Sequence, residues 1–277
     1  MSTTTSRWID LNGADNVRDL GGLPTGDGRA VRPHRLIRSD SLQSLTPADV
    51  RHLVDDLGVR AVADLRTGIE VDSEGPGPMT REPQVDVRHF SLFPEAGRNT
   101  DALAAEDGAD DVVHDKPVVL PWQTRERVES DDERRRGATG IYLGYLDDRA
   151  DSVLAALRLI AHTDGATVVH CAAGKDRTGV VVALALAEVG VEPDAIVDDY
   201  ARSAERVEAT LRRLAARHTY AADILADVDL DQHKPRAATM ARLLAAIDDF
   251  HGGVPAWLRA HGWTEADATA LRQRLLG

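Results

Sequence analysis

A run of apolar and β-branched residues, 166–169, leads into a short loop that holds the only cysteine of the chain, and an apolar helical run, 180–187, follows. This order is typical of a buried strand, a tight loop and a helix. Gly174 permits a loop whose successive N–H groups point inward, and the helix that follows adds the positive end of its dipole. The stretch 168–179 therefore predicts a cradle for a phosphate dianion.

Cys171 stands at the base of this cradle, and Arg177 follows it with five residues between them. A lone cysteine is most often a small buried hydrophobic residue. Here the loop amides and Arg177 favour the thiolate, which is the nucleophilic form. The planar guanidinium of Arg177 matches two oxygens of a phosphoryl group, a geometry that lysine does not offer. We therefore interpret Cys171 as a nucleophile.

Composition excludes several classes of function. The net charge of −13 argues against nucleic acid or an anionic membrane as the main partner. One cysteine forms no internal disulfide, and a reactive thiol favours a reducing compartment, so we expect a cytoplasmic protein. The first residues show no basic stretch followed by an apolar segment, and no apolar run reaches membrane-spanning length, although export without a cleaved signal stays open.

The segment His-Cys-x5-Arg-Thr-Gly resembles the signature of the cysteine-dependent protein tyrosine phosphatases. Its ending, 174–179, resembles one branch more closely, the bacterial lid-bearing tyrosine phosphatases, which have also been linked to phosphoserine, phosphothreonine and phosphoinositide substrates. The runs 16–22 and 64–67, the latter followed by Glu70, also match patterns of this branch. The resemblance implies an α/β fold with a central, mostly parallel sheet flanked by helices.

The rest of the chain fits one phosphatase domain over 1–277. We predict a helix from Thr46 as N-cap to about residue 57, a buried strand over 59–66 and a second strand over 85–90. Prolines and acidic runs indicate a solvated, irregular insertion around 98–137. Helical patterns follow over 141–160, with a break near 147–148, and through much of the C-terminal part. The stretch 200–235 is either a mobile helical lid, as in the resembled family, or a plain packed helical hairpin.

The candidate site residues follow from the loop and from the resemblance. Cys171 attacks in line to give a phosphocysteine, while Arg177 and the loop amides take up charge on the equatorial oxygens, so that neither metal nor cofactor is needed. Thr178 can hydrogen-bond the sulfur, and we expect His170 to fix the cysteine backbone. The substrate-binding candidates are Ala172, Ala173, Gly174, Lys175, Thr178, Asp64, Arg66 and Arg18.

Asp176 and Asp64 are both candidates for the general acid, and the sequence leaves the choice between them open. The resembled branch assigns the proton donor to the position of Asp176, which is our first choice for the general acid. Asp64 is the second choice, or else it orients Arg177. Asp64 and Arg66 lie at the carboxyl end of a predicted strand, where ligands bind in open α/β sheets. The alternative for Asp176 is a structural partner of Lys175 or Arg18.

Two alanines follow the nucleophile, where phosphoinositide phosphatases with a similar loop often place lysine directly after the cysteine. We therefore rank phosphotyrosine proteins or peptides first as partners, with phosphoserine and phosphothreonine next. The alternatives are a phosphoinositide phosphatase and a non-catalytic phosphate-binding scaffold, and a sulfur-transfer enzyme of the rhodanese type is a further rival. We expect no nucleic-acid partner and no stable membrane insertion.

Overall fold

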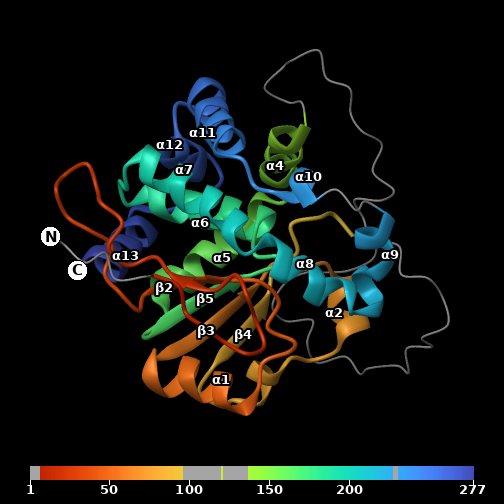
Figure 1. Ribbon diagram of the computed structural model, residues 1–277. Coiled ribbons are helices and arrows are strands. Elements are labelled where there is room, and N and C mark those ends of the chain that lie inside the picture. The colour runs from red at the N-terminus through yellow and green to blue at the C-terminus, as the bar shows by residue number, and fades with distance from the viewer. Residues whose placement is uncertain (1–6, 96–119, 121–136, 227–229) are drawn as a thin grey trace, which may run out of the picture.

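A computed structural model describes residues 7–95, 120, 137–226 and 230–277, which form a sheet with helices on both faces (Figure 1). The sheet of the described part has the strand order β1-β2-β5-β3-β4. β1 pairs antiparallel with β2, and the other neighbouring pairs are parallel. The strands are β1 (Arg18–Asp19), β2 (Leu36–Ser39), β3 (Val59–Asp64), β4 (Asp86–His89) and β5 (Ala166–His170). The predicted α/β fold with a mostly parallel sheet is confirmed.

Helices make up most of the remaining described chain. The first half contains α1 (Pro47–Arg51), the π-helical turn η1 (His52–Asp56), α2 (Gly68–Glu74), the 3-10 turn η2 (Pro78–Arg81), α4 (Gly137–Asp148) and α5 (Ala150–His162). After β5 come α6 (Asp176–Glu188), α7 (Pro193–Arg202), the 3-10 turn η5 (Ser203–Glu205), α8 (Val207–Ala215), α9 (His218–Ala226), α10 (Leu230–His233), α11 (Ala237–His251), α12 (Val254–Ala260) and α13 (Glu265–Leu276).

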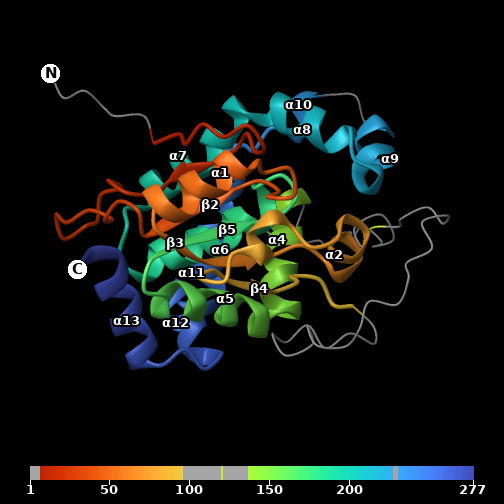
Figure 2. The ribbon, with the colours of Figure 1, turned by 90° about the horizontal axis from the view of Figure 1, so that it is seen from below.

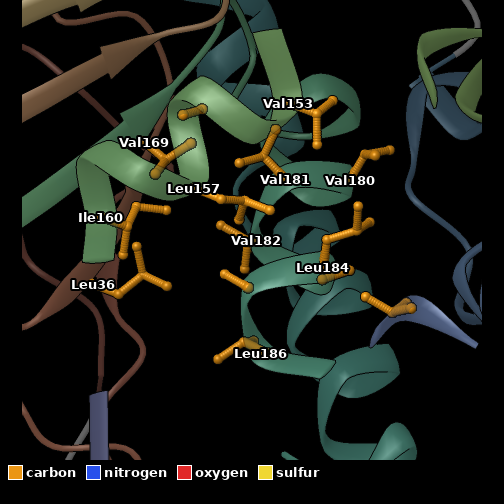
Figure 3. Close-up of a cluster of buried hydrophobic side chains, with 14 of the residues drawn as sticks. Leu36, Val153, Leu157, Ile160, Val169, Val180, Val181, Val182, Leu184 and Leu186 are labelled. Carbon is orange, nitrogen blue, oxygen red and sulfur yellow. The ribbon is translucent and has the colours of Figure 1, made fainter. Parts of the chain in front are cut away.

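Alternating residues of the strands face two separate cores. Val169 packs with residues of α5 and α6 in the larger cluster, whereas Val168 packs with residues of α1 and η1 on the opposite face. Figure 2 shows α1 on one side of the sheet and α5 on the other, and Figure 3 shows Val169 beside side chains of α5 and α6. A strand buried on both faces reads as a continuous apolar run, which is why 166–169 carries no polar alternation.

Local sequence signals set several helix boundaries. Thr46 caps α1, and its hydroxyl accepts from the Asp49 N–H while the Asp49 carboxylate accepts from the Thr46 N–H. The predicted break near 147–148 is present, because α4 ends at Asp148 and α5 begins at Ala150. The predicted strand over 59–66 ends at Asp64, so Arg66 stands in the loop after it.

The predicted insertion around 98–137 lies almost entirely outside the described residues. Within the described ranges, no helix combines the length and the apolar character that crossing a membrane requires.

Candidate active site

Cys171 directly follows β5, the central strand, and therefore stands at the carboxyl edge of the sheet. It is only 2% exposed. Gly174 has a φ of +65°, and a Cβ atom there would lie 2.4 Å from the Ser39 carbonyl oxygen at the end of β2. Conformation and space both require glycine at this position. The phosphate loop, residues 171–177, is thus packed tightly against the neighbouring strand.

The backbone of this loop is paired on one side only. Within the described part of the chain, the N–H groups of residues 172–176 donate to no protein acceptor. The carbonyl oxygens of residues 171–175 all accept hydrogen bonds from the protein. Uncommitted N–H groups in front of a helix N-terminus bind anions, because partial positive charge accumulates there. The loop therefore has the donors for a phosphoryl group.

Arg177 is held by Glu70, the third residue of α2. Its Nη1 and Nη2 atoms donate to the two carboxylate oxygens of Glu70 at 2.5 and 3.0 Å, and Nη1 also donates to the Leu65 carbonyl oxygen at 3.3 Å. Arg177 is 6% exposed and Glu70 is fully buried. Burial alone would raise the pKa of Glu70, but the charge and hydrogen bonds of Arg177 outweigh burial and hold that pKa below its ordinary value. Glu70 is therefore a carboxylate that orients the guanidinium.

Glu70 can be placed there because Thr67 begins α2 with a capping box. The Thr67 hydroxyl accepts from the Glu70 N–H, and the Glu70 carboxylate accepts from the Thr67 N–H. Tyr220 of α9 also donates to Glu70 at 3.1 Å. The Thr-x-x-Glu spacing was a visible signal in the sequence, but it indicated only a helix start. The partner of Glu70 lies 107 residues away, and the sequence analysis assigned no role to it.

Asp64 contacts two cationic or ionisable neighbours at the end of β3. Its carboxylate accepts from Arg66 Nε and Nη2, at 2.9 and 2.6 Å, and lies 3.6 Å from His170 Nε2. Burial would raise the pKa of Asp64, but Arg66 and His170 outweigh it and keep the pKa well below its usual range. The described contacts give no support to the expectation that Asp64 orients Arg177, because Glu70 occupies that position.

Asp176 is the first residue of α6, and its side chain is 36% exposed. The Tyr142 hydroxyl donates to its carboxylate, and Lys175 Nζ lies 3.4 Å from the other carboxylate oxygen. Burial and the nearby Asp176 raise the pKa of Tyr142, so the phenol stays protonated and keeps a proton to donate to the Asp176 carboxylate. Tyr142 also contacts the Tyr200 hydroxyl at 2.7 Å. Tyr142 is 1% exposed, so its hydroxyl reaches Asp176 from within the core.

Two other candidates have contacts that differ from those expected. The guanidinium of Arg18 is fully buried and binds Asp199, Asn16 and Ser203, and among the described residues it makes no hydrogen bond to the phosphate loop itself. The Thr178 hydroxyl is buried and has no hydrogen-bond partner among the described residues, so the expected bond to sulfur is not formed here. His170 contacts the Cys171 carbonyl oxygen through Nδ1 at 3.2 Å.

The helical pair α8–α9 lies over the phosphate loop. Ala172 belongs to a small apolar cluster with Leu214 of α8 and Tyr220 of α9, and Ala173 packs against that cluster. Figures 1 and 2 both show α9 beside α2, the helix that carries Glu70. Lys175 Nζ donates to the His233 carbonyl oxygen in α10 at 2.9 Å. The described helices α8, α9 and α10 therefore lie against the phosphate loop.

A thiol beneath uncommitted amides, at the end of the central strand and beside a buried arginine, is the arrangement of the cysteine-dependent phosphatases. The comparisons with known proteins agree with this class. The family model described as "Tyrosine phosphatase family" matches residues 9–277, and the chain belongs to this family.

Two curated relatives span nearly the same length. The chain is 33% identical to the triple specificity protein phosphatase PtpB of Mycobacterium tuberculosis, over 97% of this chain and 99% of the relative. It is 27% identical to a tyrosine-protein phosphatase of Nostoc commune, over 91% of this chain and 78% of the relative. The resemblance stated from the sequence is thereby confirmed, and the chain is classed as a tyrosine-protein phosphatase.

Proposed function

We propose that this tyrosine phosphatase hydrolyses phosphomonoesters with Cys171 as the nucleophile. The observation that carries the proposal is the set of uncommitted N–H groups at residues 172–176, next to the buried guanidinium of Arg177. These donors can take up negative charge on the equatorial oxygens, and they are worth most where water is excluded. The protein itself thus supplies the positive groups that phosphoryl transfer requires.

In the first step the Cys171 sulfur attacks phosphorus, the P–O bond to the leaving group breaks, and a phosphocysteine forms. Asp176 gives its proton to the leaving oxygen. In the second step water attacks phosphorus, Asp176 takes a proton from that water, and the S–P bond breaks to release phosphate and thiolate. Thr178, whose hydroxyl is uncommitted among the described residues, is the donor we assign to the departing sulfur.

The contacts favour Asp176 over Asp64 as the proton donor. Asp64 is 6% exposed, and its low pKa keeps it ionised near neutral pH, whereas a general acid must carry a proton before the reaction. Asp176 is partly exposed at the start of α6, where a leaving oxygen bound over the loop can reach it. We therefore assign Asp64 to holding Arg66 and His170, and Arg18 to supporting the protein beneath the loop.

For the substrate class, we rank phosphotyrosine in a protein or peptide first. Ala172 and Ala173 give no extra positive charge beside the nucleophile, which argues against a highly anionic lipid headgroup. The relative named a triple specificity phosphatase supports activity toward more than one class of phosphomonoester. Initial rates on a phosphotyrosine peptide, a phosphoserine peptide and soluble phosphoinositides would rank these classes. We place the enzyme in a reducing compartment such as the cytoplasm, because its single cysteine must stay a thiol.

Cys171 is only 2% exposed, so a substrate can reach its sulfur only if part of the protein moves away from the phosphate loop. We assign the movement to α8–α9, because the family resemblance implies a helical lid in this region and Leu214 of α8 packs in the same apolar cluster as Ala172 of the loop. Arg217 joins this pair to Ser44 at 2.9 Å and to Glu74. These polar contacts can break at less cost than the buried core.

The test of the function is Cys171→Ser, measured with an aryl phosphate in the presence of a metal chelator. Serine keeps the size of the side chain but is not ionised at neutral pH, so turnover should vanish while inorganic phosphate still binds. Wild-type protein that binds phosphate but shows no turnover would favour the phosphate-binding scaffold. Full activity of the serine variant would refute the role of Cys171.

A further inference from the structure

The outward-facing carbonyl oxygens of the phosphate loop are bound by other groups of the protein, most of them far away in the sequence. Ser41 N–H donates to Ala172 O at 2.9 Å, and Gly179 N–H donates to Lys175 O at 2.9 Å. The side chains of Asn16 and Arg38 bind the carbonyl oxygens of 173–175 between them. Because a peptide unit holds its C=O and N–H in opposite directions, fixing the oxygen also aims the N–H of the next residue.

Asn16 is 2% exposed and bridges two of these carbonyls. Its Nδ2 atom donates to Ala173 O at 3.0 Å and to Gly174 O at 3.2 Å. Its Oδ1 atom accepts from Arg18 Nη1 at 2.7 Å, and since a guanidinium can only donate, this contact fixes which end of the amide faces the loop. The Asn16 backbone is itself held, because its N–H donates to Asp40 at 3.0 Å.

Arg38 of β2 is 1% exposed and holds the next part of the loop. Its Nη2 atom donates to Gly174 O at 2.8 Å, and its Nη1 atom donates to Asp199 at 2.9 Å. The same Asp199 carboxylate accepts from Arg18 Nε at 3.1 Å. Burial would raise the pKa of Asp199, but Arg18 and Arg38 outweigh burial and keep it ionised. One carboxylate of α7 therefore fixes both arginines.

From this chain of contacts we infer that Asn16 and Arg38 are positioning residues for catalysis, with Asp199 and Arg18 holding them in place. They turn the carbonyl oxygens of 173–175 away from the phosphate, so that the N–H groups of 174–176 face it. They touch neither the substrate nor the sulfur. The inference rests on the proposed function, because it concerns how the same loop binds its anion.

A positioning role and a purely structural role for Asn16 predict different results for anion binding. If Asn16 only stabilises the fold, its loss lowers the melting temperature and leaves anion binding unchanged in protein that is still folded. If it aims the amides, its loss weakens the binding of vanadate and shifts the alkylation of Cys171 to higher pH, because the same N–H groups stabilise both anions.

The test is Asn16→Asp, which keeps the shape and the oxygen that faces Arg18 but replaces the amide donor by an acceptor. We expect kcat/KM for an aryl phosphate to fall about 10- to 100-fold, the range typical of groups that orient a directly acting group. The inhibition constant of vanadate should rise by a similar factor. The pH midpoint of Cys171 alkylation by iodoacetamide should move upward.

The matched control is Gln43→Glu. The Gln43 amide also donates to two successive backbone carbonyls, those of Glu74 and Gly75, and within the described part of the chain it makes no hydrogen bond to the phosphate loop. This variant should keep the wild-type vanadate inhibition and alkylation profile. If Asn16→Asp does not fold, Asn16→Ser, whose shorter side chain cannot bridge the two carbonyls, is measured in the same way.

The outcomes separate this inference from the proposed function. A folded Asn16 variant that matches wild type in vanadate inhibition and alkylation would overturn the positioning role alone. A wild-type protein that neither binds vanadate nor turns over substrate would instead contradict the proposed function.

Discussion

Replacing Glu70 by glutamine removes the negative charge that holds Arg177 and leaves almost the same shape. Glutamine can accept one hydrogen bond from the guanidinium, but its NH2 group then faces a second N–H of Arg177, and two donors repel each other. The amide also binds the Tyr220 hydroxyl and the Thr67 N–H less strongly than a carboxylate does. The change therefore affects both the stability of the protein and the direction of the guanidinium.

The burial of the pair sets the size of the effect. Glu70 is fully buried and Arg177 is 6% exposed, so water cannot replace the lost carboxylate. Breaking a buried ion pair by removing one partner costs about 3–5 kcal/mol of unfolding free energy. For a protein of this size that corresponds to a melting temperature lower by about 5–9 °C. We also expect kcat/KM to fall about 10- to 100-fold, less than for complete removal of an oxyanion donor.

The stability difference should depend on pH in a defined direction. The pKa of Glu70 is lower in the folded protein than in the unfolded chain. Its contribution is therefore fully present above the unfolded pKa of about 4.3, and it is lost as the pH falls through the folded value. The difference between wild type and Glu70→Gln should be largest near neutral pH and should shrink in acid.

Urea unfolding at several pH values and steady-state kinetics with an aryl phosphate would measure these effects. The control is Asp86→Asn in β4, whose carboxylate pairs with Arg88 in an ion pair whose two side chains are both 48% exposed. Partial exposure of that pair predicts a loss of only about 1 kcal/mol or less, without a loss of kcat/KM. If Glu70→Gln unfolds within about 1 kcal/mol of wild type and keeps its kcat/KM, the assignment of Glu70 as the group that orients Arg177 is wrong.

Three further changes test other parts of the site. Asp176→Asn should lower kcat by about 10²- to 10⁴-fold for alkyl phosphates and by less for aryl phosphates with good leaving groups, and an equal loss for both would contradict its role as the acid. Arg217→Ala, which removes the contacts of the α8–α9 connection with Glu74 and Ser44, should speed iodoacetamide alkylation of Cys171 several-fold, and an unchanged rate would contradict the opening of α8–α9. Burial raises the pKa of Asp40 to about 7, so in the folded state this acid stays protonated over a pH range in which the unfolded chain releases its proton. Relative to Asp40→Asn, the unfolding free energy of wild type should therefore decrease by up to about 4 kcal/mol as the pH rises from about 4 to about 7, and parallel pH profiles in urea would refute this.

The parts of the fold that were predictable from the sequence are those set by neighbouring residues. The β-branched run before Cys171 and the apolar run after Arg177 lie next to each other, and their strand and helix are present as β5 and α6. The Thr46 cap and the break after Asp148 are local signals as well. Each depends on backbone propensity or capping within a few residues, which the sequence displays directly.

The contacts that the sequence did not reveal join residues that are far apart along the chain. The Glu70–Arg177 pair spans 107 residues and the Tyr142–Asp176 bond spans 34. The bonds from Asn16 to the phosphate loop span 157 and 158 residues. No periodicity or spacing rule identifies such partners, because they depend on how the strands are ordered in the sheet. The order β2-β5-β3, for example, is what brings the ends of β2 and β3 to either side of Cys171.

The dependence of the phosphate loop on Asn16, Arg18 and Arg38 has a practical consequence for work on this enzyme. A shortened version that begins at β3 would keep the whole signature of residues 170–179 and still lack the side chains that hold its backbone. Such a fragment should be inactive even though every residue of the motif is present. Libraries that diversify the enzyme for new substrates should therefore leave these three positions unchanged.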